Sequence, residues 1–172
     1  MDCPKRFFAV YPSLNKCEDV MTIEERKEAA ALFILRIGLA WFIFLWAAHK
    51  IITPKQYQGL VRHFEGVEVS FSQIYATAGI QIALCILTAI GMFRLISYSG
   101  LAIMHLFTVT RRWEGFFDPF ALNDRGFPIH RNQVIDLAVL AAFIALILLI
   151  HRDHFSLGAW LRKRMGKPVW WL

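Results

Sequence analysis

The sequence is short of charged residues, and this shortage narrows what the chain can be. Only 19% of its 172 residues are charged, whereas 57% are hydrophobic. A soluble domain of this size cannot hide so many large apolar side chains, because much of its surface must face water. A membrane is the simplest solvent for this composition. With 6 Pro and 10 Gly, a collagen-like or long disordered chain is excluded, and the length predicts one domain.

Motifs for tightly bound redox cofactors are missing as well. The 3 cysteines, Cys3, Cys17 and Cys85, share no CxxC spacing, so no zinc knuckle, iron–sulfur cluster or disulfide framework is expected. No GxGxxG motif marks a flavin or nicotinamide site. Any electrons for a redox reaction would therefore have to come from another protein.

Four apolar runs predict an all-α membrane protein, a bundle of four transmembrane helices. A span needs about 20 residues, because a helix rises about 1.5 Å per residue and the hydrocarbon core is about 30 Å thick. The run over residues 74–110 is too long for one span and would place Arg94 near its middle, so it predicts two spans joined at Gly91 to Arg94. The predicted spans are 30–52, 74–92, 95–110 and 134–150.

Capping signals predict where the first and last spans begin. Thr22 and Glu25 have the spacing of a capping box, so the first helix is expected to begin near Ile23 and to run into the first span. Asn132 is the expected N-cap of the last span. Residues 1–21 carry no recognisable cleavable signal, so the first span is expected to direct insertion.

The distribution of basic residues predicts the orientation. The net charge is +6, and Lys and Arg stand at the ends of the apolar runs, which favours lipid headgroups and not nucleic acid as the anionic partner. Eleven Lys and Arg lie on the side of the two termini, and seven, including Lys50 at the end of the first span, lie on the other. Both termini are therefore expected in the cytoplasm, with the bundle in the cell inner membrane. The expected divisions are a cytoplasmic segment (1–28), the bundle (29–152) and a basic, aromatic interfacial tail (153–172).

The two outer connections are expected to be structured. Thr53 and Pro54 predict a helix start, and Tyr57, Leu60, Val61 and Phe64 then recur at the spacing of an amphipathic helix on the outer surface. The second connection, residues 111–132, carries five aromatic residues and is named here the aromatic loop. Its length and composition predict a packed cap over the bundle.

Polar residues inside the predicted spans share one face on each helix. They are Arg36 and Lys50 on the first span, Thr77, Gln81 and Thr88 on the second, Ser97, His105, Thr108 and Arg112 on the third, and Asn132, Gln133 and Asp136 on the fourth. Because polar groups are costly against lipid, these faces should converge inside the bundle. The outer half is thus a candidate ligand pocket. Its candidate residues are Lys50, His105, Thr108, Arg112, Asp136, His49 and Arg131, with His63 and His130 in its roof.

The chemistry of this set suits a quinone. His or Lys can donate to a quinone carbonyl, and a His/Asp pair can move the protons that accompany reduction. The same residues also have purely structural explanations. Lys50 and the arginines can snorkel at the membrane boundary, His105 can be a packing histidine, and Asp136 can pair with Lys50 or Arg112 to fix helix packing.

Haem and metal sites are not expected. Haem ligation by two histidines needs matched depths on facing helices, but His49 and His105 differ by roughly 10–15 Å along the membrane normal at about 1.5 Å per residue. No HxxxH or ExxH pair lies inside a span, which disfavours a dinuclear metal site.

Three short segments resemble the DoxX-like family of four-span membrane proteins over about residues 30–165. They are Arg36-Ile37-Gly38 with the later Lys50 and Pro54, Gly91-Met92-Phe93-Arg94, and His151-Arg152-Asp153-His154-Phe155-Ser156-Leu157-Gly158, with Gly158 where the family usually has Asp. The resemblance implies a four-helix membrane bundle, most often bacterial. The family includes a membrane subunit of a thiosulfate:quinone oxidoreductase and partners of redox-stress enzymes, and most members have no assigned activity.

Two functions therefore stay open. The first is a redox-associated membrane protein that holds a quinone, possesses no haem, flavin or metal, and works with a separate redox protein. The second is a non-catalytic assembly subunit of a membrane complex, as a homo- or hetero-oligomer, with Ala76, Gly79 and Ala83 spaced for close helix contact. A transporter is disfavoured, because no pair of broken helices is present.

Overall fold

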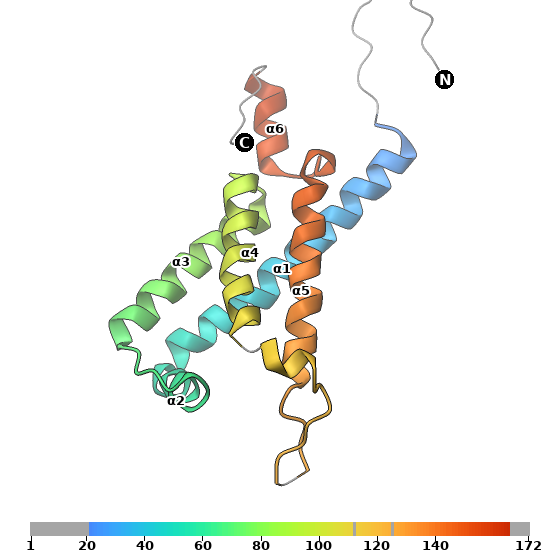
Figure 1. Cartoon of the computed structure of the whole chain (residues 1–172). Helices are drawn as coiled ribbons and strands as arrows, with labels where there is room; N and C mark the ends of the chain where they lie inside the picture. The colour runs from blue at the N-terminus through green and yellow to red at the C-terminus, as the bar shows by residue number, and fades with distance from the viewer. Residues whose placement is uncertain (1–20, 112, 125, 166–172) are drawn as a thin grey trace, which may run out of the picture.

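A computed structural model describes residues 21–111, 113–124 and 126–165, and all regular secondary structure in these residues is helical. Figure 1 shows the long helices crossing at different tilts, with the short helices at the two ends. The elements are α1 (Ile23–Ile52), α2 (Pro54–Glu65), α3 (Phe71–Ile90), α4 (Arg94–Thr110), η2 (Trp113–Phe116), α5 (Arg131–Leu148), η3 (Ile150–Arg152) and α6 (Leu157–Met165). The prediction of an all-α chain is confirmed for these residues.

Two of the helix starts are fixed by capping boxes. Thr22 accepts from the Glu25 backbone N–H, and the Glu25 carboxylate accepts from the Thr22 backbone N–H at 2.8 Å, as the sequence predicts. This backbone hydrogen bond favours the charged carboxylate and lowers the pKa of Glu25. Ser70 and Gln73 form the same arrangement at the start of α3. These side chains satisfy N–H groups that a helix end would otherwise leave without partners.

The predicted hairpin between the second and third spans is confirmed. α3 ends at Gly91, which has φ +71°, and α4 begins three residues later at Arg94. Glycine suits this left-handed position because it has no Cβ to collide with the backbone. Phe93 also has a positive φ, of 47°. The turn therefore reverses the chain within a few residues and places α3 beside α4.

The amphipathic helix predicted after Pro54 is α2. Pro54 is its first residue, and Gly66 ends it in the left-handed conformation with its N–H donated to the Arg62 carbonyl. Val61 on its apolar face is buried, whereas Leu60 is exposed. The Gln58 side chain donates to the Val69 carbonyl at 2.7 Å, which ties the helix to the segment that leads into α3.

The start of α5 and the aromatic loop differ from the predictions. α5 begins at Arg131 with His130 as N-cap, so Asn132 is the second helical residue and not the cap. A main-chain bond from the Gln133 N–H to the His130 carbonyl, at 3.1 Å, stands where a side-chain cap was expected.

The prediction of a packed aromatic cap is wrong for most of the loop. Phe120 is 87% exposed, and Trp113, Phe117 and Phe127 are exposed as well. The chain closes on itself here through main-chain bonds such as Asn123 N–H to the Phe127 carbonyl, so the rings turn outward. In Figure 1 this segment extends beyond the ends of α4 and α5.

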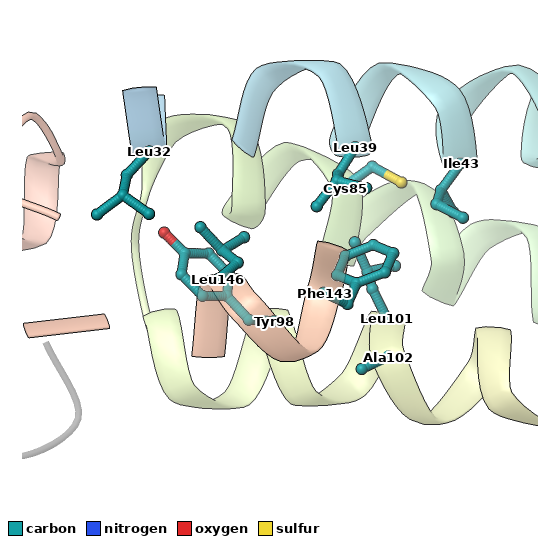
Figure 2. Packing of buried hydrophobic residues seen from close by; sticks show 9 residues of the cluster. All are labelled: Leu32, Leu39, Ile43, Cys85, Tyr98, Leu101, Ala102, Phe143 and Leu146. Atoms are coloured by element: carbon teal, nitrogen blue, oxygen red, sulfur yellow. The ribbon is translucent and has the colours of Figure 1, made fainter. Parts of the chain in front are cut away.

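The hydrophobic core lies where the four long helices meet. Figure 2 shows it as a cluster to which every one of these helices contributes. Its members are Leu32, Leu39 and Ile43 of α1, Cys85 of α3, Tyr98, Leu101 and Ala102 of α4, and Phe143 and Leu146 of α5. Burying such side chains stabilises the bundle, and α2 and α6 lie outside this cluster.

Two helices, α1 and α3, are long and apolar enough to cross a membrane. α4 and α5, at 17 and 18 residues, are shorter. Large apolar side chains are exposed on all four of the long helices, for example Trp41, Ile80, Ile103 and Leu148. The four-span arrangement remains a prediction.

Candidate functional site

Buried polar side chains gather at the two ends of the bundle. At one end the first half of α1, the α3/α4 turn and the segment after α5 come together. Toward the other end, Lys50 near the end of α1 contacts Gln81 in the middle of α3, and His105 of α4 contacts Asp136 near the start of α5. Figure 1 shows α6 near the first end and α2 near the second.

A fully buried ion pair occupies the first end. Arg36 Nη1 donates to both carboxylate oxygens of Asp153, at 2.8 and 2.7 Å, and the two side chains are 1% and 0% exposed. Arg36 Nη2 donates to the Phe155 carbonyl at 2.9 Å. A buried charge needs such partners, because its desolvation is otherwise uncompensated. The first helix is therefore tied to the segment that follows the last long helix.

Two residues of α4 hold the same segment from the other side. The Tyr98 hydroxyl donates to Asp153 Oδ2 at 2.7 Å. Arg94 Nη1 donates to the carbonyls of Ile150 and Asp153, at 3.0 and 2.8 Å. Both residues donate to groups of the short segment between α5 and α6. Polar contacts therefore fix the path of the chain from α5 to α6.

The α3/α4 turn closes this cluster. The Gly158 N–H donates to the Gly91 carbonyl at 3.1 Å. A Cβ placed on Gly91 would lie 2.5 Å from Ser156 Cβ and 2.8 Å from Arg36 Nη1. Only glycine therefore permits the close approach of the turn to both the ion pair and the start of α6.

The second end holds the His/Asp pair that the sequence predicts. His105 is buried, and its Nε2 lies 2.9 Å from the Asp136 main-chain carbonyl and 3.9 Å from the Asp136 carboxylate oxygen Oδ1. A carbonyl only accepts, so Nε2 carries a hydrogen and Nδ1 is the nitrogen that can take up a further proton. This pair joins α4 to α5 and can carry a proton.

Lys50 forms a hydrogen bond with Gln81 and not the predicted ion pair with Asp136. Its Nζ donates to Gln81 Oε1 at 2.8 Å and lies 5.2 Å from the centre of the Tyr57 ring. Lys50 also experiences the positive charge of Arg111 at the end of α4. The predicted pairing of Asp136 with Lys50 is therefore replaced by a Lys50–Gln81 bond between α1 and α3, since an amide oxygen satisfies the ammonium group as well.

The remaining candidates lie apart from these two contacts. His49 is half-buried and meets the Trp46 ring edge-on, with 6.4 Å between ring centres. Thr108 is exposed and donates to the Met104 carbonyl of its own helix, so it does not line the interior as predicted. Arg112 and the side chain of Arg131 lie outside the described residues. Of the predicted roof, His63 is exposed and His130 is half-buried.

The site predictions missed the Arg36–Asp153 cluster as a centre of interactions. One signal was present, because Arg36 is a single charge within an apolar run, and such a charge has a specific partner or function. Asp153 carried no comparable signal, since it lies outside every predicted span.

Two further observations bear on possible ligands. An apolar groove of about 210 Å³ runs between α1 and α3 and is lined by Ile37, Ala40, Trp41, Phe44, Cys85, Ile86 and Ala89. Among the described residues, no group of three or more His, Cys, Asp and Glu side chains is arranged to hold a metal ion. The groove is apolar, and neither His105 nor Lys50 lines it.

Comparison of the chain with protein-family models, with curated proteins and with solved structures finds no match.

Proposed function

We propose that this chain is a DoxX-like, four-span bundle of a bacterial inner membrane that binds a quinone in its outer half. The observation that carries the proposal is the buried His105 beside the Asp136 carboxylate, at 3.9 Å. The protein supplies a ligand pocket and a proton-carrying pair. A separate membrane or membrane-associated redox protein supplies the electrons.

The exposed surface of the long helices supports a membrane location. Trp41, Ile80, Ile103 and Leu148 are each more than half exposed, and they lie on four different helices. Such a surface is unfavourable in water and favourable against lipid chains. α4 and α5 are short for spans, at 17 and 18 residues, but about 25 Å of helix lies close to the thickness of a thin hydrocarbon core.

The His105–Asp136 pair suits quinone chemistry. Reduction of a quinone to a quinol takes up two electrons and two protons. His105 is bonded to α5 through Nε2, which leaves Nδ1 for proton transfer. A carboxylate nearby stabilises the protonated imidazole.

The first prediction concerns quinone bound to the purified protein. We expect an organic extract of the detergent-purified chain to contain quinone in molar proportion. We expect His105→Leu to retain roughly tenfold less, because a lost hydrogen bond of about 1.4 kcal/mol changes an equilibrium tenfold. Mass spectrometry of the extract measures both quantities.

The matched control is Thr110→Val. Thr110 lies on the same helix, is exposed, and bonds only carbonyls of its own helix in the described contacts. It should retain quinone like the wild type. Quinone at no more than the level of bulk lipid in the wild type, or equal retention in His105→Leu, would contradict the proposal. Thermal denaturation of each variant shows whether its fold is intact.

An assembly subunit is the second candidate, and one observation favours it. Ala76, Gly79 and Ala83 of α3 are all exposed, and nothing lies within 4 Å of a Cβ placed on Gly79. Small residues of this kind let another helix approach closely. A stoichiometric protein partner that is lost in Gly79→Ile, with no bound quinone, would favour this function over the first.

A further inference from the structure

We propose that the junction of η2 with α5 distinguishes the reduced from the oxidised form of the ligand, with His130 and Gln133 as its hydrogen-bonding residues. This inference rests on the proposed function and adds residues and a redox preference to it. Neither residue is among the ligand-binding candidates named from the sequence, where His130 stood only in the roof.

Within the described part of the chain, two buried polar atoms at this junction have no hydrogen-bond partner. They are His130 Nδ1 and Gln133 Oε1, and Gln133 as a whole is only 4% exposed. Buried polar atoms are nearly always paired, because an unpaired one loses its bonds to water without replacement. Two such atoms on one turn of helix indicate a place for a guest that forms hydrogen bonds.

Both side chains lie against the same glycine of η2. A Cβ placed on Gly115 would be 2.7 Å from His130 Nδ1 and 3.0 Å from Gln133 Cγ. Any larger residue at position 115 would therefore cover Nδ1. Glycine lets η2 pack close to the first turn of α5, where His130 Nδ1 is buried.

The junction continues the line of the His105–Asp136 pair. Residues 130, 133 and 136 follow one another at intervals of three, so each lies about 4.5 Å along the axis and about 60° around it from the one before. Asp136 at the inner end of this line accepts from His105 through its main-chain carbonyl. A ring bound beside His105 can thus present one of its oxygens to His130 and Gln133.

The two atoms together favour a hydroxyl group. The amide oxygen of Gln133 accepts only, while a histidine Nδ1 that carries hydrogen donates. A quinol hydroxyl can donate to Gln133 Oε1 and accept from His130 Nδ1 at the same time. A quinone carbonyl can only accept, so it leaves Gln133 Oε1 unsatisfied. The junction is therefore complementary to the quinol.

The experiment compares binding of decylubiquinol and decylubiquinone to the full-length, detergent-purified protein under anaerobic conditions. We expect the wild type to bind the quinol roughly tenfold more tightly, the ratio expected for about one hydrogen bond. Gln133→Leu should abolish this preference and leave quinone affinity within about twofold of wild type. His130→Phe should weaken binding of both forms, because both accept a hydrogen bond from His130 Nδ1. Gln56→Leu and His151→Phe are controls of the same type at exposed positions and should keep the preference.

The outcomes separate this inference from the proposed function. A wild-type protein that binds neither compound overturns both. A wild type that binds both forms equally, or a Gln133→Leu variant that keeps the preference, overturns the role of the junction and leaves quinone binding in place. A Gln133→Leu protein that melts at a higher temperature with unchanged binding would show that the two atoms hold a buried water only, and would also overturn the inference.

Discussion

Asp153→Ala is expected to destabilise the protein by about 3–5 kcal/mol, the cost of breaking a buried ion pair from one side. The substitution leaves the Arg36 guanidinium, which is 1% exposed, without its carboxylate, and it leaves the buried Tyr98 hydroxyl without its acceptor. For a chain of this size, about 2–4 °C per kcal/mol predicts a fall in melting temperature of roughly 6–20 °C. Thermal denaturation in detergent measures it.

The matched control is the exposed ion pair of the same region. Arg152 Nη1 lies 3.4 Å from Glu28 Oε2, and both side chains are more than half exposed. Glu28→Ala should cost less than about 1 kcal/mol, because solvent screens exposed pairs. The double variant Arg36→Leu/Asp153→Leu should recover part of the loss, since it removes both buried charges. Equal melting temperatures for Asp153→Ala and Glu28→Ala would show that the buried pair contributes little.

Gly91→Ala is expected to have the second large effect, a loss of about 2–5 kcal/mol. A left-handed φ of +71° costs an alanine about 1–2 kcal/mol, and overpacking typically costs about 1–3 kcal/mol more. The overpacking arises because the new Cβ would meet Ser156 Cβ at 2.5 Å, and the Ser156 backbone cannot easily retreat while Gly158 is bonded to Gly91. The measurement is again the melting temperature.

Two other glycines separate these contributions. Gly66 also has a positive φ, of 67°, but nothing lies within 4 Å of its Cβ position, so Gly66→Ala measures backbone strain alone. Gly79 lies within α3 with open space around it, so Gly79→Ala should be neutral or stabilising by up to about 1 kcal/mol. A loss in Gly91→Ala no larger than in Gly66→Ala would exclude the close contact with Ser156 as a cause.

The helices could be predicted from the sequence to a large extent because their signals are local. Thr22 with Glu25, Pro54 and Gly91 each act through backbone groups within a few residues, and the helices begin or end there as expected. The start of α5 was misplaced because His130, which offers no side-chain cap, takes the cap position by a main-chain bond. The prediction for the aromatic loop was wrong because amino-acid composition does not reveal that the main chain of the loop forms hydrogen bonds within the loop.

The sites could be predicted only in part, because they depend on contacts between distant residues. His105 and Asp136 each carry a polar group on an interior face, so their meeting followed from helix periodicity. Periodicity did not identify the partner of Lys50, because Gln81 and Asp136 could each accept a hydrogen bond from its ammonium group. The Arg36–Asp153 bond joins residues 117 positions apart, and no local pattern specifies it.

That separation has a consequence for how the chain is made. Arg36 leaves the ribosome 117 residues before Asp153, which at about 5–20 residues per second is a delay of roughly 6–23 s. During this time the first helix carries a charge that has no carboxylate to pair with. If the chain is the membrane bundle proposed above, Arg36 has to remain hydrated, or near headgroup phosphates, until the last helices emerge. The final depth of the first helix is then set at the end of synthesis, when the arrival of Asp153 permits its arginine to leave water.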